Sequence, residues 1–288
     1  MRLVDLHVHT TASDGLYSPA QLVGEALKRG LAAVAITDHD TMKGLQELDS
    51  TTANCSLEIV PGIEFSTFYQ KKEIHLLGYY CDPENLQLQE TLSKNHRDRH
   101  LRMEKMVNKL KEMDVFVELD EVLATVKGGV IGRPHLAAVL CQKGYCSTVE
   151  EAFNSYIGYN RPAYVERAPF SPGEAIAVIK EAGGFPVLAH PGLGNDDTYI
   201  PSLVHAGIKG LEVYHPEHDA ASITKYLRLA REYDLVVTGG SDFHGEHSGP
   251  SLHIGTVTVD YSSLEAIKKS LRLQGKGAND LNIVKKGF

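Results

Sequence analysis

The chain has 288 residues, of which 42% are hydrophobic and 23% are charged, proportions that are ordinary for a globular protein with a substantial core. Its formal net charge of −8 argues against a broad electrostatic surface for duplex nucleic acid, but it leaves room for a small phosphorylated ligand or a short single strand. No run approaches the roughly 18 apolar residues that span a bilayer, and the first residues are too polar for a secretion signal, so we expect no membrane association and a cytoplasmic location.

Short apolar runs alternate with helix-like stretches along most of the chain. In the first part we expect strands over Arg2–His9, Leu31–Thr37, Leu57–Val60 (ending at Pro61-Gly62) and Glu73–Tyr79, and a helix over Pro19–Arg29 with Ser18 as its N-cap. Near the C-terminus we expect strands over Phe185–Ala189, Gly210–Val213 and Val236–Thr238, and helices over Pro172–Ala182 and Ala220–Tyr233. Strands that alternate with helices indicate a parallel α/β sheet or barrel.

The alternation breaks between residues 84 and 168. There the apolar positions recur at helical spacing, at Met103, Met106, Val107, Leu110 and Met113. The Lys- and Arg-rich stretch from Lys94 to Lys111 is interpreted as the solvated face of this amphipathic helix. We therefore predict a mainly helical insertion at residues 84–168, which forms part of the substrate pocket of a barrel built from residues 1–83 and 169–288.

Histidines and carboxylates gather at the ends of the predicted strands. His7 and His9 lie two residues apart on a strand, so their side chains point to the same face and can bind one ion. Asp14 follows in the loop beyond the strand. Further groups follow later apolar runs or open them: His39, Glu64, His75, His190, Asp242 and His244. Barrel enzymes build their sites at the C-terminal ends of strands, so this pattern predicts a polynuclear metal site.

Six segments carry a resemblance to a known family. DLHVHTTASDG, ITDHD, PGIEFS, IHLLGY, LAHPG and GGSDFHG, in this order between residues 2 and 245, resemble the motifs of the PHP (polymerase and histidinol phosphatase) family. The resemblance implies a distorted (β/α)7 barrel that holds three divalent ions. It implies that His7, His9, Glu64 and Asp242 hold one ion, that Glu64 bridges to a second held by His75 and His190, and that Asp14, His39 and His244 hold the third.

These ligand types point to phosphate chemistry. Imidazole and carboxylate suit Mn²⁺, Zn²⁺ or Fe²⁺, and the sequence does not choose among them. Such ions give a hydroxide nucleophile near neutral pH and neutralise phosphoryl oxygens, which predicts a metal-dependent phosphoesterase. A barrel of the amidohydrolase or deaminase type also begins with HxH, but the additional ligand set of Asp14, His39 and His244 favours phosphate esters. A non-catalytic metal-binding module is the alternative from another class.

The insertion resembles that of the nucleotide phosphoesterases within the family, which hydrolyse 3′,5′-bisphosphonucleotides (pAp to AMP and phosphate) and trim short RNA from its 5′ end. The resembling segments are GRPHLA at residues 132–137, NRPAYV at 160–165 and GLEVYHP at 210–216. Arg133 and Arg161 are candidates for a bidentate contact to phosphate, and His135 and His215 for binding phosphate or protonating the leaving group. We expect a nucleotide or short single-stranded RNA as substrate, with histidinol phosphate as the main rival, and no obligate protein partner.

Overall fold

The structure is a computed structural model that describes residues 2–48, 56–70, 72–126, 129–194, 197–245 and 253–273. Its sheet has the strand order β7-β6-β5-β4-β3-β2-β1-β8. The strands are β1 (Leu3–Val8), β2 (Ala33–Ile36), β3 (Glu58–Tyr69), β4 (Lys72–Tyr79), β5 (Phe185–Leu188), β6 (Gly210–Tyr214), β7 (Val236–Gly239) and β8 (Val259–Asp260). The helices around the barrel are α1 (Pro19–Lys28), α2 (Lys43–Gln46), α7 (Pro172–Glu181), α8 (Ile200–Ala206), α9 (Ala220–Glu232) and α10 (Tyr261–Leu273).

The sheet curls until the residues after β7 meet β1, so that the strands form a nearly closed barrel. The Asp242 N–H donates to the His7 carbonyl at 2.9 Å, and the His9 N–H donates to the Phe243 carbonyl at 3.0 Å. The two residues of β8 pair antiparallel with the start of β1. The predicted barrel of strands and surrounding helices is therefore confirmed, and α2, α8, α10 and β8 add to the elements expected from the sequence.

The fourth strand, β4, runs antiparallel to both of its neighbours. β1, β2 and β3 are parallel to one another, and so are β5, β6 and β7. We call the rim formed by the C-terminal ends of these parallel strands the barrel mouth. Because β4 is reversed, its N-terminal end lies at the mouth, and His75 near its start pairs with Ser66 of β3.

The third strand does not end at Pro61-Gly62, and that prediction is wrong. β3 continues to Tyr69 and pairs with β4 from Gly62 onward. Pro61 stays within the sheet because its carbonyl accepts a hydrogen bond from the Tyr80 N–H at 2.7 Å. A Cβ on Gly62 would lie 2.8 Å from the Ile36 carbonyl oxygen, so a glycine allows the close approach of β2. The strand therefore carries Glu64 in its interior.

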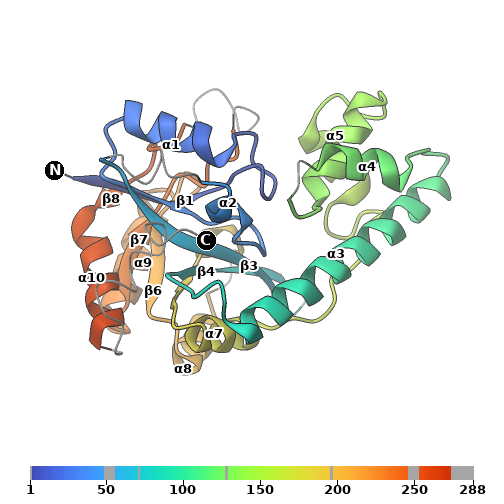
Figure 1. Ribbon diagram of the computed structural model, residues 1–288. Helices are drawn as coiled ribbons and strands as arrows, with labels where there is room; N and C mark the ends of the chain where they lie inside the picture. The colour runs from blue at the N-terminus through green and yellow to red at the C-terminus, as the bar shows by residue number, and fades with distance from the viewer. Residues whose placement is uncertain are drawn as a thin grey trace.

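Helices α3 (Leu86–Lys111), α4 (Leu119–Thr125), α5 (Arg133–Gln142) and α6 (Val149–Ala152) and the π-helix η2 (Phe153–Ile157) lie between β4 and α7 in sequence. Figure 1 shows α3 leading away from the barrel, with α4 and α5 near its far end. The predicted apolar positions Met103, Met106, Val107 and Leu110 join a cluster with residues of α4 and α5, whereas Met113 lies beyond the end of α3. In the described residues, no helix is long and apolar enough to cross a membrane.

Closure of the barrel leads to a prediction at Gly240, which follows β7. An added Cβ would meet the backbone nitrogen of His7 and lie 2.5 Å from its Cβ, so we expect Gly240→Ala to force the two segments apart. Overpacking of this kind should lower the free energy of unfolding by about 1–3 kcal/mol. Gly24→Ala in α1 is the matched control, because nothing lies within 4 Å of its added Cβ. Urea denaturation measures both variants, and an unchanged midpoint for Gly240→Ala would contradict the prediction.

Candidate functional site

The nine predicted metal ligands converge at the barrel mouth. Their donor atoms form four overlapping groups, each within 4.8 Å: His9, Asp14, His39 and His244; His7, His190 and Asp242; His7, His9 and Glu64; and His39, Glu64 and His75. Glu64 and His75 lie within β3 and β4, and the others lie in β1 or in the loops after β1, β2, β5 and β7. The fold thus brings together side chains that are as far apart in sequence as residues 7 and 244.

Glu64 lies at the centre of these groups and is 1% exposed. Its Oε1 is 2.8 Å from His75 Nδ1 and 3.0 Å from His190 Nε2. Its Oε2 is 3.0 Å from His39 Nδ1 and 3.2 Å from His9 Nε2. Burial would raise the pKa of Glu64, but the surrounding histidines, His39 foremost, hold it well below its usual range. The carboxylate therefore stays ionised, and its two oxygens face different groups of ligands.

Hydrogen bonds on the outer ring nitrogens fix the orientation of two histidines. His7 Nδ1 lies 3.0 Å from Glu212 Oε1, and His244 Nδ1 lies 2.8 Å from the Asp242 carbonyl oxygen. Because an ionised carboxylate or a carbonyl only accepts, each Nδ1 carries the proton and each Nε2 keeps a lone pair for a metal. The other oxygen of the fully buried Glu212 accepts from the His190 N–H at 2.8 Å. Glu212 lies within the GLEVYHP segment, but the sequence alone indicates no role for it.

Two of the candidate metal ligands have a left-handed backbone conformation. His190 has a φ of 24° and Asp242 a φ of 49°. Residues other than glycine seldom adopt this region, and such strain is concentrated at functional sites where the surrounding structure enforces it. Here the enforcing contacts are the bonds from the His190 N–H to Glu212 and from the Asp242 N–H to His7. Both turns direct a side chain toward the ligand groups at the mouth.

The donor set fits divalent cations. In the described residues, three buried carboxylate oxygens have histidine nitrogens nearby but accept no well-oriented hydrogen bond: Asp14 Oδ1, Glu64 Oε2 and Asp242 Oδ1. An ionised oxygen buried without a partner is strongly unfavourable, and a cation offsets that cost. Burial opposes protonation of His7, but Glu212 and Asp242 outweigh it and hold the pKa of His7 well above its usual range. The cluster therefore attracts positive charge, either as protons or as metal ions.

The two predicted proton donors flank this centre. His215 Nδ1 accepts from the Glu217 N–H at 3.1 Å, so the neutral ring carries its proton on Nε2, which lies 3.3 Å from Asp242 Oδ2. His135 Nδ1 accepts from the Gly132 N–H at 3.1 Å, which leaves its proton on Nε2 as well. Burial, which outweighs the nearby Asp14, lowers the pKa of His135. Both rings can therefore donate a proton from a defined nitrogen.

A cluster of four arginines adjoins the ligands. Arg133 and Arg167 both contact the Glu73 carboxylate, at 2.7 and 2.8 Å, and Glu73 in turn lies 3.4 Å from Nε2 of the candidate ligand His75. Arg167 also lies 3.7 Å from Asp40 Oδ2. The other two arginines come from α3: Arg99, whose Nε donates to Asp40 Oδ2 at 2.8 Å, and Arg102, whose Nε donates to the Val165 carbonyl at 2.7 Å.

Arg102 lacks a carboxylate partner among the described residues. It is 8% exposed, and its Nη2 is buried with no hydrogen-bond acceptor in the part of the chain described. Burial, followed by repulsion from Arg167 and Arg133, lowers the pKa of Arg102 to about 9. Three of the four guanidinium groups thus share the two carboxylates of Asp40 and Glu73, and the fourth has none in the described part of the chain, so the cluster holds an excess of buried positive charge.

The arginine cluster corrects one interpretation and leaves one prediction open. The stretch from Lys94 to Lys111 is not simply a solvated face, because Arg99 and Arg102 of α3 are buried beside the site. Arg133 lies in the cluster, as the sequence suggested. Arg161 is exposed, and no ion pair joins it to the described residues of the cluster. The structure therefore adds Arg99, Arg102 and Arg167 to the basic residues that the sequence motifs indicate.

Comparison with known proteins identifies the family of this chain. The model of the PHP domain matches residues 5–166. The 5′-3′ exoribonuclease Rnm of Escherichia coli is 32% identical over 250 residues, which cover 84% of this chain and 85% of that protein. The phosphoribosyl 1,2-cyclic phosphate 1,2-diphosphodiesterase of Eggerthella lenta is 32% identical over 263 residues, 87% of this chain and 97% of that protein.

A third relative is the 3′,5′-nucleoside bisphosphate phosphatase of Chromobacterium violaceum, 30% identical over 257 residues, 86% of this chain and 90% of its own length. The crystal structure of a metal-dependent phosphoesterase from Bifidobacterium adolescentis superposes with a TM-score of 0.87 at 32% identity, covering 96% of this chain and 97% of that one. Cleavage of phosphate esters is common to these proteins, and clusters of metal-binding residues lie at the mouth of this barrel. The chain belongs to the PHP family and is a metal-dependent hydrolase of phosphate esters.

Proposed function

We propose that the protein removes a phosphate from nucleotides that carry a second phosphate, with 3′,5′-bisphosphonucleotides such as pAp as the main substrate class. The 5′ end of a short RNA offers the same combination of a terminal phosphate and a phosphodiester, and is the related substrate. The observation that carries the proposal is the excess of buried positive charge beside His75, one of the metal-ligand candidates. A second phosphate of the substrate would supply the missing negative charge.

Three divalent ions, Mn²⁺, Zn²⁺ or Fe²⁺, would occupy the ligand groups at the mouth. His7, His9, Glu64 and Asp242 are proposed for one ion, Glu64 with His75 and His190 for the second, and Asp14, His39 and His244 for the third. His9 also belongs to the group of Asp14, His39 and His244, and His39 also belongs to the group of Glu64 and His75, so each of these two rings would lie within reach of two ions. Bound ions would supply an activated water and neutralise the oxygens of the reacting phosphate.

The protein's own residues would bind and orient the substrate and move its protons. Arg102, Arg133 and Arg167 would hold the non-reacting phosphate by charge-assisted hydrogen bonds. The N-terminus of α5, which begins at Arg133, adds the favourable end of its helix dipole. His135 would donate its Nε2 proton to the leaving oxygen, whereas His215 would hold Asp242 Oδ2 in position.

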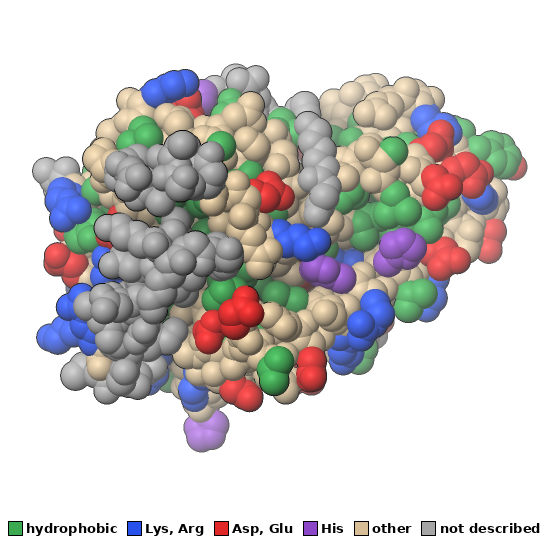
Figure 2. Space-filling view, in the orientation of Figure 1, with side chains coloured by type: hydrophobic (Ala, Val, Ile, Leu, Met, Phe, Trp, Pro, Cys, Tyr) green, Lys and Arg blue, Asp and Glu red, His purple; other side chains and the backbone are tan. Residues whose placement is uncertain are grey.

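The surface charge and the named relatives are compatible with a short substrate. Figure 2 shows acidic and basic side chains interspersed over the visible face, and the net charge of the chain is −8. A nucleotide or a short RNA end needs only the local cations of the cluster. An exoribonuclease and a nucleoside bisphosphate phosphatase are both among the relatives. The relative that acts on a cyclic phosphoribosyl phosphate supplies a rival, and histidinol phosphate remains another.

A direct assay of the purified protein with added Mn²⁺ tests the proposal. We expect release of phosphate from pAp with a higher kcat/KM than from histidinol phosphate or from 5-phosphoribosyl 1,2-cyclic phosphate. Asp242→Ala should lower turnover by orders of magnitude, because it removes a buried carboxylate that is proposed to hold a metal ion. A clear preference for histidinol phosphate or for the cyclic phosphate would refute the proposed substrate while keeping the phosphoesterase chemistry.

Glu212→Gln tests how the metal ligands are positioned. The carboxylate accepts from His7 Nδ1 with one oxygen and from the His190 N–H with the other. Glutamine offers only one acceptor oxygen, so its NH₂ group would face a donor, and we expect about a 10- to 100-fold loss of metal affinity. Titration with a competing chelator, read by mass spectrometry of bound metal, measures it. Glu217→Gln, at an exposed position nearby, is the control; equal affinity for the two variants would contradict the assignment.

Arg102→Met tests the arginine cluster while keeping most of the apolar stem. Losing a charge-assisted contact to the second phosphate should lower kcat/KM for pAp by about 10- to 100-fold. Hydrolysis of 3′-AMP and 5′-AMP, which have one phosphate each, should change much less. Arg161→Met is the matched comparison, because Arg161 is exposed. If Arg161→Met lowers kcat/KM for pAp more than Arg102→Met does, the second phosphate is held by Arg161, as the sequence motif suggests, and not by the cluster.

A further inference from the structure

A second cavity opens beside the metal centre and has a different character from the arginine cluster. It has a volume of about 590 Å³, which is within the roughly 300–1,000 Å³ of ordinary small-molecule sites. At one end lie the metal-ligand candidates Asp14 and His244, together with the proton donor His135. The cavity is therefore continuous with the place where a reacting phosphate would lie.

The walls of this cavity come from both parts of the chain. Leu16, in the loop after β1, belongs to the barrel, whereas Pro134, Ala138 and Cys141 of α5 and Val149 of α6 belong to the insertion. Leu16 and Val149 are 38% and 40% exposed, although both are large apolar side chains. Exposed apolar side chains that line one cavity indicate a ligand with apolar surface.

The charges around the cavity determine which part of a substrate can enter. In the described residues, no lysine or arginine lines it, and its only carboxylate is Asp14. The arginines contact Glu73 and Asp40 instead, outside this lining. A phosphate would thus find few stabilising contacts in the cavity. A flat ring system with apolar faces and polar edges would be stabilised there by burial of its apolar surface. Gln142 and Thr125 at the lining offer polar groups to such edges.

We propose that this cavity binds the base of the nucleotide substrate, so that one phosphate lies at the metals, the other on the arginines and the base between the barrel loop and α5. This inference rests on the proposed function. Because the lining is mainly apolar, we expect weak discrimination among bases, within about tenfold in kcat/KM for the four 3′,5′-bisphosphonucleosides.

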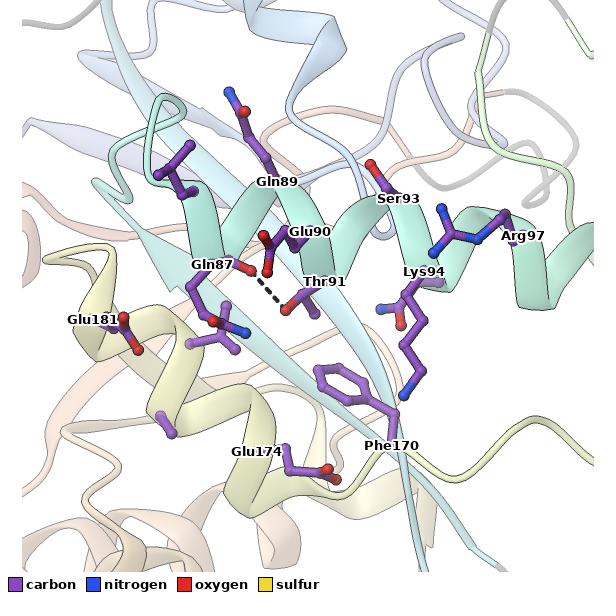
Figure 3. Close-up of a pocket in the computed structure, with 14 residues that line it drawn as sticks. Gln87, Gln89, Glu90, Thr91, Ser93, Lys94, Arg97, Phe170, Glu174 and Glu181 are labelled. Carbon is purple, nitrogen blue, oxygen red and sulfur yellow. Dashed lines mark hydrogen bonds between the residues drawn. The ribbon is translucent and has the colours of Figure 1, made fainter.

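A larger groove elsewhere on the protein offers a position for a control substitution. It lies between α3 and α7, has a volume of about 770 Å³ and is lined by Lys94, Arg97, Glu90, Glu174 and Glu181 among others (Figure 3). None of the nine metal-ligand candidates lines it. Ala177 of α7 lines this groove as Ala138 of α5 lines the base cavity. The same substitution at these two alanines therefore separates filling of the base cavity from a general effect of a bulky helix residue.

The experiment compares pAp with an abasic analogue, in which hydrogen replaces adenine on the same sugar and both phosphates remain. We expect the wild-type protein to prefer pAp by about 10- to 100-fold in kcat/KM, because the base adds buried apolar surface. Ala138→Phe, which fills the cavity, should abolish that preference, so that kcat/KM for pAp falls to the value for the abasic analogue. Ala177→Phe should keep the preference. Val149→Ser, at a partly exposed position, should reduce it several-fold without the risk of overpacking α5.

Three results would overturn the inference. Equal hydrolysis of pAp and the abasic analogue by the wild-type protein would exclude a base site and leave the proposed function standing. A preference for pAp that survives in both Ala138→Phe and Val149→Ser would place the base elsewhere. Hydrolysis of neither compound, with turnover of another phosphate ester, would instead refute the proposed nucleotide substrate and the base cavity with it.

Discussion

An ionised carboxylate in the interior of a barrel strand is the constraint on which the site depends. Glu64 has nitrogens of five histidines within 3.4 Å: His7, His9, His39, His75 and His190. Such a group is several kcal/mol unfavourable without nearby positive charge, so its neighbours are arranged to hold protons or cations. Glu64 reaches this position only because β3 continues past Pro61 and Gly62. The architecture of one strand and the chemistry of the centre therefore depend on each other.

The sequence revealed much of the metal centre because parallel strands bring their C-terminal ends to one rim. This rule places His7, His39, His190 and Asp242 together without knowledge of any long-range contact. It does not explain His75, which lies near the start of its strand. The direction of β4 depends on its pairing with β3 and β5, and no local pattern specifies that direction. For the same reason, the continuation of β3 through a proline could not be derived from residues 57–62 alone.

The arginines were harder to find because residue type and position gave opposite indications. A run rich in lysine and arginine is typical of a solvated helix face. However, Arg99 and Arg102 lie at helical spacing from Met103 and Met106, on the buried stripe of α3. The helical spacing of these residues therefore predicts their burial better than their charge does. Arg167 gave no such indication, because it lies in an irregular segment after η2 and is positioned by its contacts with Glu73 and Asp40.

The reversed β4 has a geometric consequence for α3. A strand that starts at the mouth ends at the opposite rim, so the chain must travel back along the barrel before it can contribute to the site. At 1.5 Å per residue, the 26 residues of α3 span roughly 39 Å, enough for this return. The helix also fixes a phase: each residue added or removed turns everything beyond it by about 100°. A length change near its start would therefore either rotate Arg99 and Arg102 or, for a whole turn, move them by about 5.4 Å along the axis, so α3 sets the distance between the barrel and the helices that follow it.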